Sequence, residues 1–277
     1  MKQATAFAPG NVSCVFKIVT DPAPEKMHSL GMGFTVREGV TVSVRPDSAT
    51  NVAFNGRPID FPAVQTVAES LTDQPVRVTL DTPLPLGCGF GLSGASSLAT
   101  AYAVDALLGL GRSPRDLAMA AHVAEVRCLS GLGDVCAQFH GGWLVKLREG
   151  DPLAAVRTSV PEQPIFYRYF GPIDTRSVIG SAEQKQRINA AADTALAALA
   201  ILIDAREAAA ESYIEASKAF AIASGLLTDP RVRHTIEQVE AAGGHASMVM
   251  LGHAVFSTAP FDGATETQMS IRAAEVL

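Results

Sequence analysis

The sequence lacks long hydrophobic runs, a secretion signal and an excess of basic charge. In 277 residues, the longest uninterrupted apolar run covers nine residues, 195–203, about half the length that spans a bilayer. The first ten residues, MKQATAFAPG, contain no apolar signal core, so we expect no secretion and a cytoplasmic location. Asp and Glu outnumber Lys and Arg by 28 to 22, a net charge of −6. We therefore expect neither nucleic acid nor a membrane as a partner.

Metal-site cysteine patterns and several common catalytic motifs are also missing. None of the four cysteines forms a CxxC pair, and none stands at zinc-ligand spacing with a pair of histidines. The motifs HExxH, GxSxG and GxxxxGK[ST] do not occur, which argues against zincins, α/β-hydrolases and P-loop proteins. Hydrophobic residues make up 48% and charged residues 18% of the chain, a balance that favours a folded core over disorder.

The order of predicted elements indicates a mixed α/β chain. Alternation and β-branched residues predict strands, and alanine-rich stretches bounded by glycine or by Ser113-Pro114 predict helices. In the first half, strands are expected at 34–36, 40–44, 76–80 and 143–147, and helices at 95–110 and 114–127. In the second half, strands are expected at 165–170, 247–251 and 254–258, and helices at 182–203, 205–224 and 229–242. We place a domain boundary between 1–155 and 156–277.

The most distinctive local feature is a glycine-rich stretch, PLGCGFGLSGA, between a predicted strand and a predicted helix. Alternate glycines let a backbone approach a ligand closely. The helix that follows adds unpaired N–H groups and the positive end of its dipole. This combination suits phosphate without a basic protein surface. The candidate nucleotide-binding residues are Pro85, Gly87, Cys88, Gly89, Phe90, Gly91, Leu92, Ser93, Gly94 and Ala95.

Three interpretations of this stretch compete. It can be a flexible loop without a ligand, a dinucleotide site of the GxGxxG type over 89–94, or the triphosphate loop of a small-molecule kinase. A dinucleotide site requires glycines directly after the strand and an acidic residue about 20 positions on. Pro83 and Pro85 separate the strand from the glycines, and Arg112 lies where the acidic residue is expected. These two departures favour the kinase loop.

Three segments together resemble the GHMP kinases, whose phosphate loop is PxGxGLGSSA. The glycine-rich stretch matches that loop, Ala8-Pro9-Gly10-Asn11 resembles the first motif of the family, and residues 243–252 lie where its third motif occurs. The resemblance covers nearly the whole chain. It implies a two-domain α+β fold with mixed α/β character, in which the N-terminal domain carries the phosphate loop and the C-terminal domain is ferredoxin-like. It further implies ATP and Mg²⁺ as cofactors and a homodimer.

Within that superfamily the chain is most similar to the archaeal pantoate kinases. The matching segments are GFGLSGA at 89–95, AHVAEV at 121–126, GLGDVCAQ at 131–138 and ASMVMLG at 246–252. The resemblance implies phosphorylation of the primary hydroxyl of pantoate to 4-phosphopantoate, a step in archaeal coenzyme A synthesis. The alternatives are another hydroxy acid such as mevalonate, or a nucleotide-binding protein without catalysis.

Three side chains are candidates for the chemistry. On the resemblance, Ser93 and Glu125 hold the metal, and Asp134 is the base or the orienting carboxylate for the acceptor hydroxyl. From the residues alone, a helix cap is the favoured role of Asp134. The alternative for Glu125 is a solvated helix face, although Arg127 does not share that face and cannot pair with it.

The acceptor site is expected around Ser29, Gly31, Asp134 and Lys146. The segment SLGMG at 29–33 matches a substrate-side segment of the family, with Met32 in place of a small residue and Met27-His28 in place of Thr-Gly. An acidic substrate needs a cation, and Lys146 follows the Gly141-Gly142 break on a predicted strand. Arg148 is the rival because alternation puts it on the same strand face.

Overall fold

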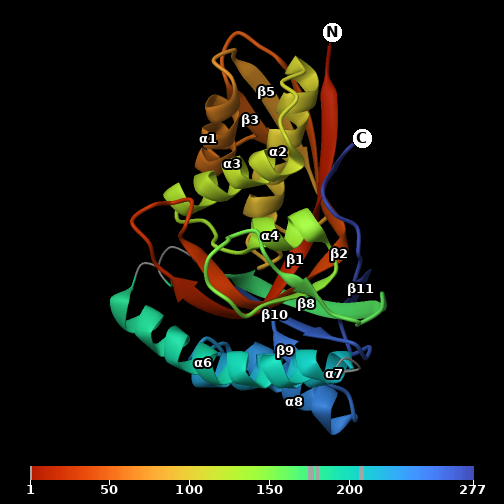
Figure 1. Cartoon of the computed structure of the whole chain (residues 1–277). Coiled ribbons are helices and arrows are strands. Elements are labelled where there is room, and N and C mark those ends of the chain that lie inside the picture. The colour runs from red at the N-terminus through yellow and green to blue at the C-terminus, as the bar shows by residue number, and fades with distance from the viewer. Residues whose placement is uncertain (1, 174–177, 179–180, 206–208) are drawn as a thin grey trace.

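The computed structural model describes residues 2–173, 178, 181–205 and 209–277 (Figure 1). Two sheets and the helices that cover them build the described part of the chain. Two long strands, β1 (Ala4–Val19) and β2 (His28–Pro46), pair over most of their length in the first sheet and run from one end of the molecule into its lower half. Because these strands are long, β1 packs against the helices α2 (Leu92–Leu108) and α4 (Asp134–His140) and also against α6 (Ala182–Asp204) and α7 (Ala210–Ala223).

The first sheet has the strand order β12-β1-β2-β5-β3-β4, with β6 also paired to β2 and to β7. Its strands are antiparallel except for the parallel pair β3 and β5. The shorter strands are β3 (Asn51–Phe54), β4 (Arg57–Pro58), β5 (Val76–Asp81), β6 (Trp143–Lys146), β7 (Val156–Arg157) and β12 (Glu275–Val276).

The second sheet has the order β11-β8-β10-β9 and is antiparallel in its described pairs. Its strands are β8 (Pro164–Pro172), β9 (Ala246–Met248), β10 (Gly252–Ser257) and β11 (Thr265–Gln268). Three helices form the layer below it in Figure 1, α6 (Ala182–Asp204), α7 (Ala210–Ala223) and α8 (Pro230–Ala241). This sheet and its helices are the α+β half of the fold.

The central helix, α2 (Leu92–Leu108), is buried on almost every side. It packs against β1, β2 and the helices α1 (Pro62–Leu71), α3 (Pro114–Arg127) and α4 (Asp134–His140). Small residues suit this position because neighbours surround α2 along most of its length, and it is exposed only near its C-terminal end. Its N-terminus is therefore held rigidly at the point where the glycine-rich loop ends.

Aromatic side chains join the cores of the two halves. Phe34 on β2 stacks on Trp143 on β6, with ring centroids 4.6 Å apart, and also contacts Phe256 on β10. Trp143 in turn lies 5.6 Å from Tyr213 on α7. One apolar core thus continues from the first sheet into the helices under the second.

Most predicted elements are confirmed, with shifted ends. The helix expected at 114–127 matches α3, and Ser113 is its N-cap, accepting from the Asp116 N–H. The strands expected at 34–36 and 40–44 are confirmed, but the break expected between them is wrong, because both belong to the single strand β2. In the helix expected at 205–224, residues 206–208 lie outside the described residues, and α7 covers Ala210–Ala223. The domain boundary near 155 stays a prediction, and β12 returns to pair with β1.

Candidate active site

The glycine-rich loop connects β5 to α2 through residues 82–91. Gly87, Gly89 and Gly91 have φ angles of +78°, +81° and +58°, a region that favours glycine. Gly91 is the N-cap of α2 and offers no side-chain cap. The first N–H groups of α2 therefore remain available at the mouth of the loop, where they and the helix dipole suit an anion.

Two other segments hold this loop in place. The Asn11 N–H on β1 donates to the Phe90 carbonyl at 2.9 Å, and the Met250 N–H donates to the Ser13 carbonyl at 3.0 Å. A Cβ on Gly252 would lie 2.5 Å from the Cys88 carbonyl oxygen, so only glycine allows this approach. The end of the ASMVMLG segment thus packs directly on the loop.

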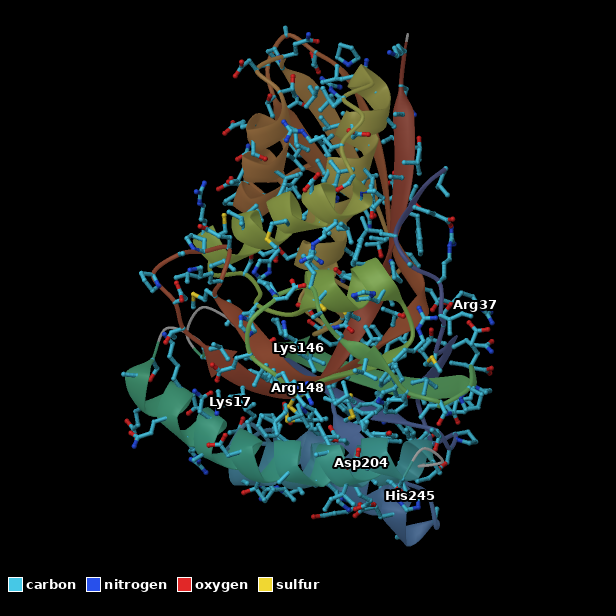
Figure 2. The ribbon with its side chains drawn as sticks, viewed as in Figure 1. Lys17, Arg37, Lys146, Arg148, Asp204 and His245 are labelled. Atoms are coloured by element: carbon cyan, nitrogen blue, oxygen red, sulfur yellow. The ribbon has the colours of Figure 1, made fainter. Side chains whose placement is uncertain are left out.

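The glycine pair of the third segment lies elsewhere. Gly243 and Gly244 follow α8, and neighbouring His245 pairs with Glu215 on α7 at 2.8 Å. Figure 2 shows His245 at the bottom of the helical layer, far from Lys146. In this chain it is residues 249–252, rather than the two glycines, that reach the phosphate loop.

A cleft with a volume of about 470 Å³ opens along the loop. Its polar lining includes the loop backbone, Ser93, Ser130 and Asp134. Its apolar lining includes the half-exposed Leu86 and Leu129. The further apolar residues are Ile59, Phe61, Ile173 and Leu251. A cleft lined by both polar and apolar groups suits the phosphates and the base of a nucleotide.

Glu125 is buried on α3, with 2% of its surface exposed, so a solvated helix face is excluded. Its Oε1 accepts hydrogen bonds from Ser93 Oγ at 2.8 Å and Ser97 Oγ at 2.7 Å. Its Oε2 is buried and has no hydrogen-bond partner in the described part of the chain. Burial raises the pKa of Glu125 to about 7, although the serine hydroxyls oppose the shift.

Asp134 is the first residue of α4, whose N-cap is Gly133. A capping role for Asp134 is therefore wrong, since its side chain is engaged elsewhere. Its Oδ1 accepts from Asn11 Nδ2 at 2.7 Å and from Ser13 Oγ at 3.3 Å. Burial raises the pKa of Asp134, and the two donors from β1 lower it.

The two carboxylates converge beside Gly131. A Cβ on Gly131 would lie 3.3 Å from both Glu125 Oε2 and Asp134 Oδ2. Gly91 and Gly94 make room on the loop side, because a Cβ on Gly91 would lie 2.8 Å from Asp134 Cγ and one on Gly94 3.0 Å from Asp134 Cβ. The free Glu125 Oε2 and the Ser93 hydroxyl are hard oxygen ligands that fit Mg²⁺, with Asp134 Oδ2 nearby. In the described ranges no three His, Cys, Asp or Glu side chains gather into a cage.

A second, smaller cavity of about 60 Å³ is lined by Asn11 and Ser13, the hydrogen-bond partners of Asp134, and by Gly133, although not by Asp134 itself. Ser29, Gly31 and Lys146 all line it, and Ser13 lines both cavities. Gly31 is paired with Phe16 on β1 and with Lys146 on β6, and a Cβ there would collide with the Val15 carbonyl oxygen, so only glycine fits this position. Three of the four residues expected at the acceptor site therefore line one cavity, and the fourth, Asp134, follows Gly133, which packs against Ser29.

Lys146 is a buried cation, with 9% of its surface exposed. Its Nζ donates to the Asp151 backbone carbonyl at 2.6 Å, and no described carboxylate lies within 4.0 Å of it. Burial lowers its pKa. Arg148 is exposed and lies beyond the end of β6 (Figure 2), so its expected place on the same strand face is wrong.

Several residues of the site were missed in the sequence. Ser97 donates to the carboxylate of Glu125, Ser130 donates to its backbone carbonyl, and Ser13 donates to the carboxylate of Asp134. Asn11 belongs to the segment that resembles the first motif of the family, but the sequence assigned it no role. Ser97 lies four residues after Ser93 on α2, a helical spacing that could have found it; Ser13 carries no comparable signal.

Three side chains near the site are structural. His122, on the same helix as Glu125, donates to the Met27 carbonyl at 2.9 Å. Burial raises the pKa of the Cys88 thiol to about 11, so this loop cysteine is unreactive. Trp143 packs in the core on Phe34.

Comparison with known proteins agrees with this geometry. Residues 60–142 match the model of the GHMP kinases N terminal domain. The chain is 30% identical over 268 residues to the pantoate kinase of Methanospirillum hungatei, covering 93% of this chain and 88% of that one. It is also 30% identical over 266 residues to that of Thermococcus kodakarensis, with 91% and 86% covered.

A solved structure described as a phosphotransferase related to the CoA biosynthesis pathway has the same fold. It superposes with a TM-score of 0.86 at 24% identity, covering 99% of this chain and 98% of the other. The fold, the glycine loop and the serine–carboxylate cluster define an ATP-dependent kinase of the GHMP class. Within that class, the chain belongs to the pantoate kinase family.

Proposed function

We propose that this chain transfers the γ-phosphoryl group of ATP to the primary hydroxyl of pantoate, with Mg²⁺ bound, and yields 4-phosphopantoate. The relatives that cover most of the chain are pantoate kinases. The observation that carries the proposal is the place of Asp134. It lines the loop cleft, and its hydrogen-bond partners Asn11 and Ser13 line the small cavity that contains Lys146. A phosphate donor and an acidic acceptor would therefore meet near Asp134.

The residues suited to the metal are Ser93 and Glu125. When bound, Mg²⁺ would neutralise charge on the triphosphate. The buried, unpartnered Oε2 of Glu125 supports this assignment, because an unmade interaction in a protein interior costs free energy unless a ligand satisfies it. Ser97 and Ser130 would keep Glu125 in position.

Asp134 would orient the acceptor hydroxyl and receive its proton. Its Oδ1 is held by two donors from β1, which leaves Oδ2 for the hydroxyl. The N-terminus of α4 favours the ionised carboxylate, against the effect of burial. Most of the catalysis in phosphoryl transfer comes from positioning and electrostatics, and both are supplied here by rigid elements.

Lys146 would bind the carboxylate of the acceptor. A buried ammonium without a carboxylate partner is unfavourable unless an anion joins it. The cavity beside it is lined by Val15, Leu30, Met32 and Leu144, which suit the branched apolar centre of pantoate. Ser29 offers a hydroxyl in the same cavity.

The test is ADP release with D-pantoate and with mevalonate, each with and without Mg²⁺, for the wild type and Asp134→Asn. We expect turnover on pantoate only, dependent on Mg²⁺, and a fall of at least about 10³-fold in the variant. Turnover on mevalonate alone would reassign the acceptor. ATP binding without turnover on either acid would indicate a nucleotide-binding protein.

We further propose a cytoplasmic homodimer that binds neither nucleic acid nor membrane. The helix α6 is long and apolar enough to cross a membrane by length and composition. It is, however, tied to β1 through the Lys17–Asp193 ion pair and the bonds of Asn189 to Ile18. Light scattering after size exclusion tests the dimer, and a vesicle flotation assay tests the membrane.

A further inference from the structure

Of the described side-chain hydrogen bonds to the Asp134 carboxylate, the one from Asn11 is the shortest. Asn11 Nδ2 donates to Asp134 Oδ1 at 2.7 Å, whereas Ser13 Oγ reaches the same oxygen at 3.3 Å. Among the described residues no hydrogen bond reaches Oδ2. A carboxylate turns readily about its last torsion, so the donor on Oδ1 decides where Oδ2 points.

The backbone around Asn11 is irregular. The register between β1 and β2 shifts between Pro9 and Asn11 and again between Ser13 and Val15. Such bulges redirect side chains next to functional sites. Here they bring the side chains of both Asn11 and Ser13 onto Asp134, although β1 otherwise supplies core residues.

Asn11 also contacts the phosphate loop. Its backbone N–H donates to the Phe90 carbonyl at 2.9 Å, so one residue links the loop and the carboxylate. It is buried, with 2% exposed, and its Oδ1 has no described partner. An asparagine kept with an unsatisfied oxygen indicates that its amide group serves a purpose other than stability.

We propose that Asn11 is a positioning residue, which fixes the orientation of Asp134 and couples it to the phosphate loop. As a neutral donor, it orients the carboxylate without neutralising its charge. The inference rests on the proposed function for the reaction that it serves. Its effect on the orientation of Asp134 can be measured without turnover.

The experiment compares Asn11→Ala and Asn11→Ser with Asn189→Ala. Asn189 is a matched control, because its side chain also bonds β1, at the Ile18 backbone, far from the loop. In the Asn11 variants we expect kcat on pantoate to fall roughly 10²-fold, with KM for ATP and pantoate within about threefold. Asn189→Ala is expected to lower the melting temperature while kcat stays within about twofold.

A double variant separates positioning from a general structural effect. In an Asp134→Ala background, Asn11→Ala is expected to lower the residual rate by less than about twofold, since it acts through the missing carboxylate. Crystal structures of the wild type and Asn11→Ser should show one orientation of Asp134 in the first and a rotated or divided one in the second. An unchanged kcat, additive losses or an unmoved carboxylate would overturn the inference. A wild type inactive on pantoate would refute only the substrate, since the crystal structures still decide the positioning role.

Discussion

At the scale of single residues, the site depends on two carboxylate oxygens that accept no hydrogen bond from the described residues. Ser93 and Ser97 share Oε1 of Glu125, and Asn11 and Ser13 share Oδ1 of Asp134. In each carboxylate the second oxygen faces the position beside Gly131. Burial raises both pKa values, so a bound cation would restore the charged forms.

Glu125→Gln tests the metal assignment. The amide oxygen can still accept from both serines, but it lacks the charge that attracts Mg²⁺. We expect a loss of at least about 10²-fold in turnover and a higher Mg²⁺ concentration for half-maximal rate. Initial rates across a Mg²⁺ titration measure this. Asp116→Asn, an exposed acid on the same helix α3, is the control and should leave the titration unchanged. Equal Mg²⁺ dependence in Glu125→Gln and the wild type would remove Glu125 from the metal site.

His122 makes stability depend on pH. Burial lowers its pKa from 6.5 to about 4, so the folded protein keeps it neutral while the unfolded chain binds a proton below pH 6.5. The free energy of unfolding should therefore fall as the pH drops from 6.5 to 4, by up to about 3 kcal/mol from this group. Buried His28, whose pKa is also lowered, acts in the same direction.

The variant His122→Gln checks this, because its amide can still donate to the Met27 carbonyl without titrating. Urea unfolding at several pH values between 4 and 7 should give a shallower decline than in the wild type. If both proteins lose stability in parallel on the acid side, His122 is not responsible.

At the scale of elements, the helix α2 begins and ends at a glycine, and the two glycines have different structural roles. Gly91 is its N-cap and Gly109 its C-cap, with φ angles of +58° and +66°. A Cβ on Gly91 would strike Asp134, whereas a Cβ on Gly109 meets no described heavy atom within 4 Å. The first glycine serves the site, and the second serves only the helix end.

Alanine substitutions at Gly91 and Gly109 separate the effect on the site from the effect on the helix end. Gly109→Ala is expected to cost about 1 kcal/mol of stability through the strained φ alone, with kcat unchanged. Gly91→Ala adds the collision with Asp134, and we expect turnover to fall by at least about 10²-fold. Melting temperature and turnover of both variants are the measurements. Comparable kcat values in the two variants would contradict the role of Gly91.

Helices and strands could be predicted where capping residues or hydrophobic alternation gave a strong local signal. The helix α3 has its Ser113 cap and Pro114, and β5 follows the alternation at 76–80. The strand β1 was missed because it is buried on both faces and therefore lacks alternation. Pro9 and Gly10, which normally end a strand, fall at its irregular register.

At the scale of the whole molecule, the two halves should unfold together. Besides the aromatic core, Ser217 Oγ on α7 donates to the Cys14 carbonyl on β1 at 3.0 Å and lies 2.8 Å from Ser247 Oγ. Such buried contacts across the halves make partial unfolding costly. The molecule is expected to behave as one cooperative unit despite its two sheets.

Ser217→Ala should lower the free energy of unfolding by about 1–3 kcal/mol. Trp143, the one tryptophan of the chain, reports on the first sheet by fluorescence, and far-ultraviolet circular dichroism reports mainly on the helices. The two transitions should coincide in the wild type and move together in the variant. Ser43→Ala, whose bond to Thr5 stays within the first sheet, is the smaller, control change. Separate transitions would show that the halves fold independently.

The class of the protein could be established from sequence, because the glycine spacing, the helix start and the order of the three motifs are local properties of the chain. The same holds for the choice of Ser93, Glu125 and Asp134 as candidates. The contacts within the site could not be predicted from sequence. Asn11 and Asp134, for example, are 123 residues apart and are brought into contact only by the packing of β1 against α4. Packing also placed Lys146 in the small cavity and Arg148 in solvent, and it left Oε2 of Glu125 without a partner among the described residues.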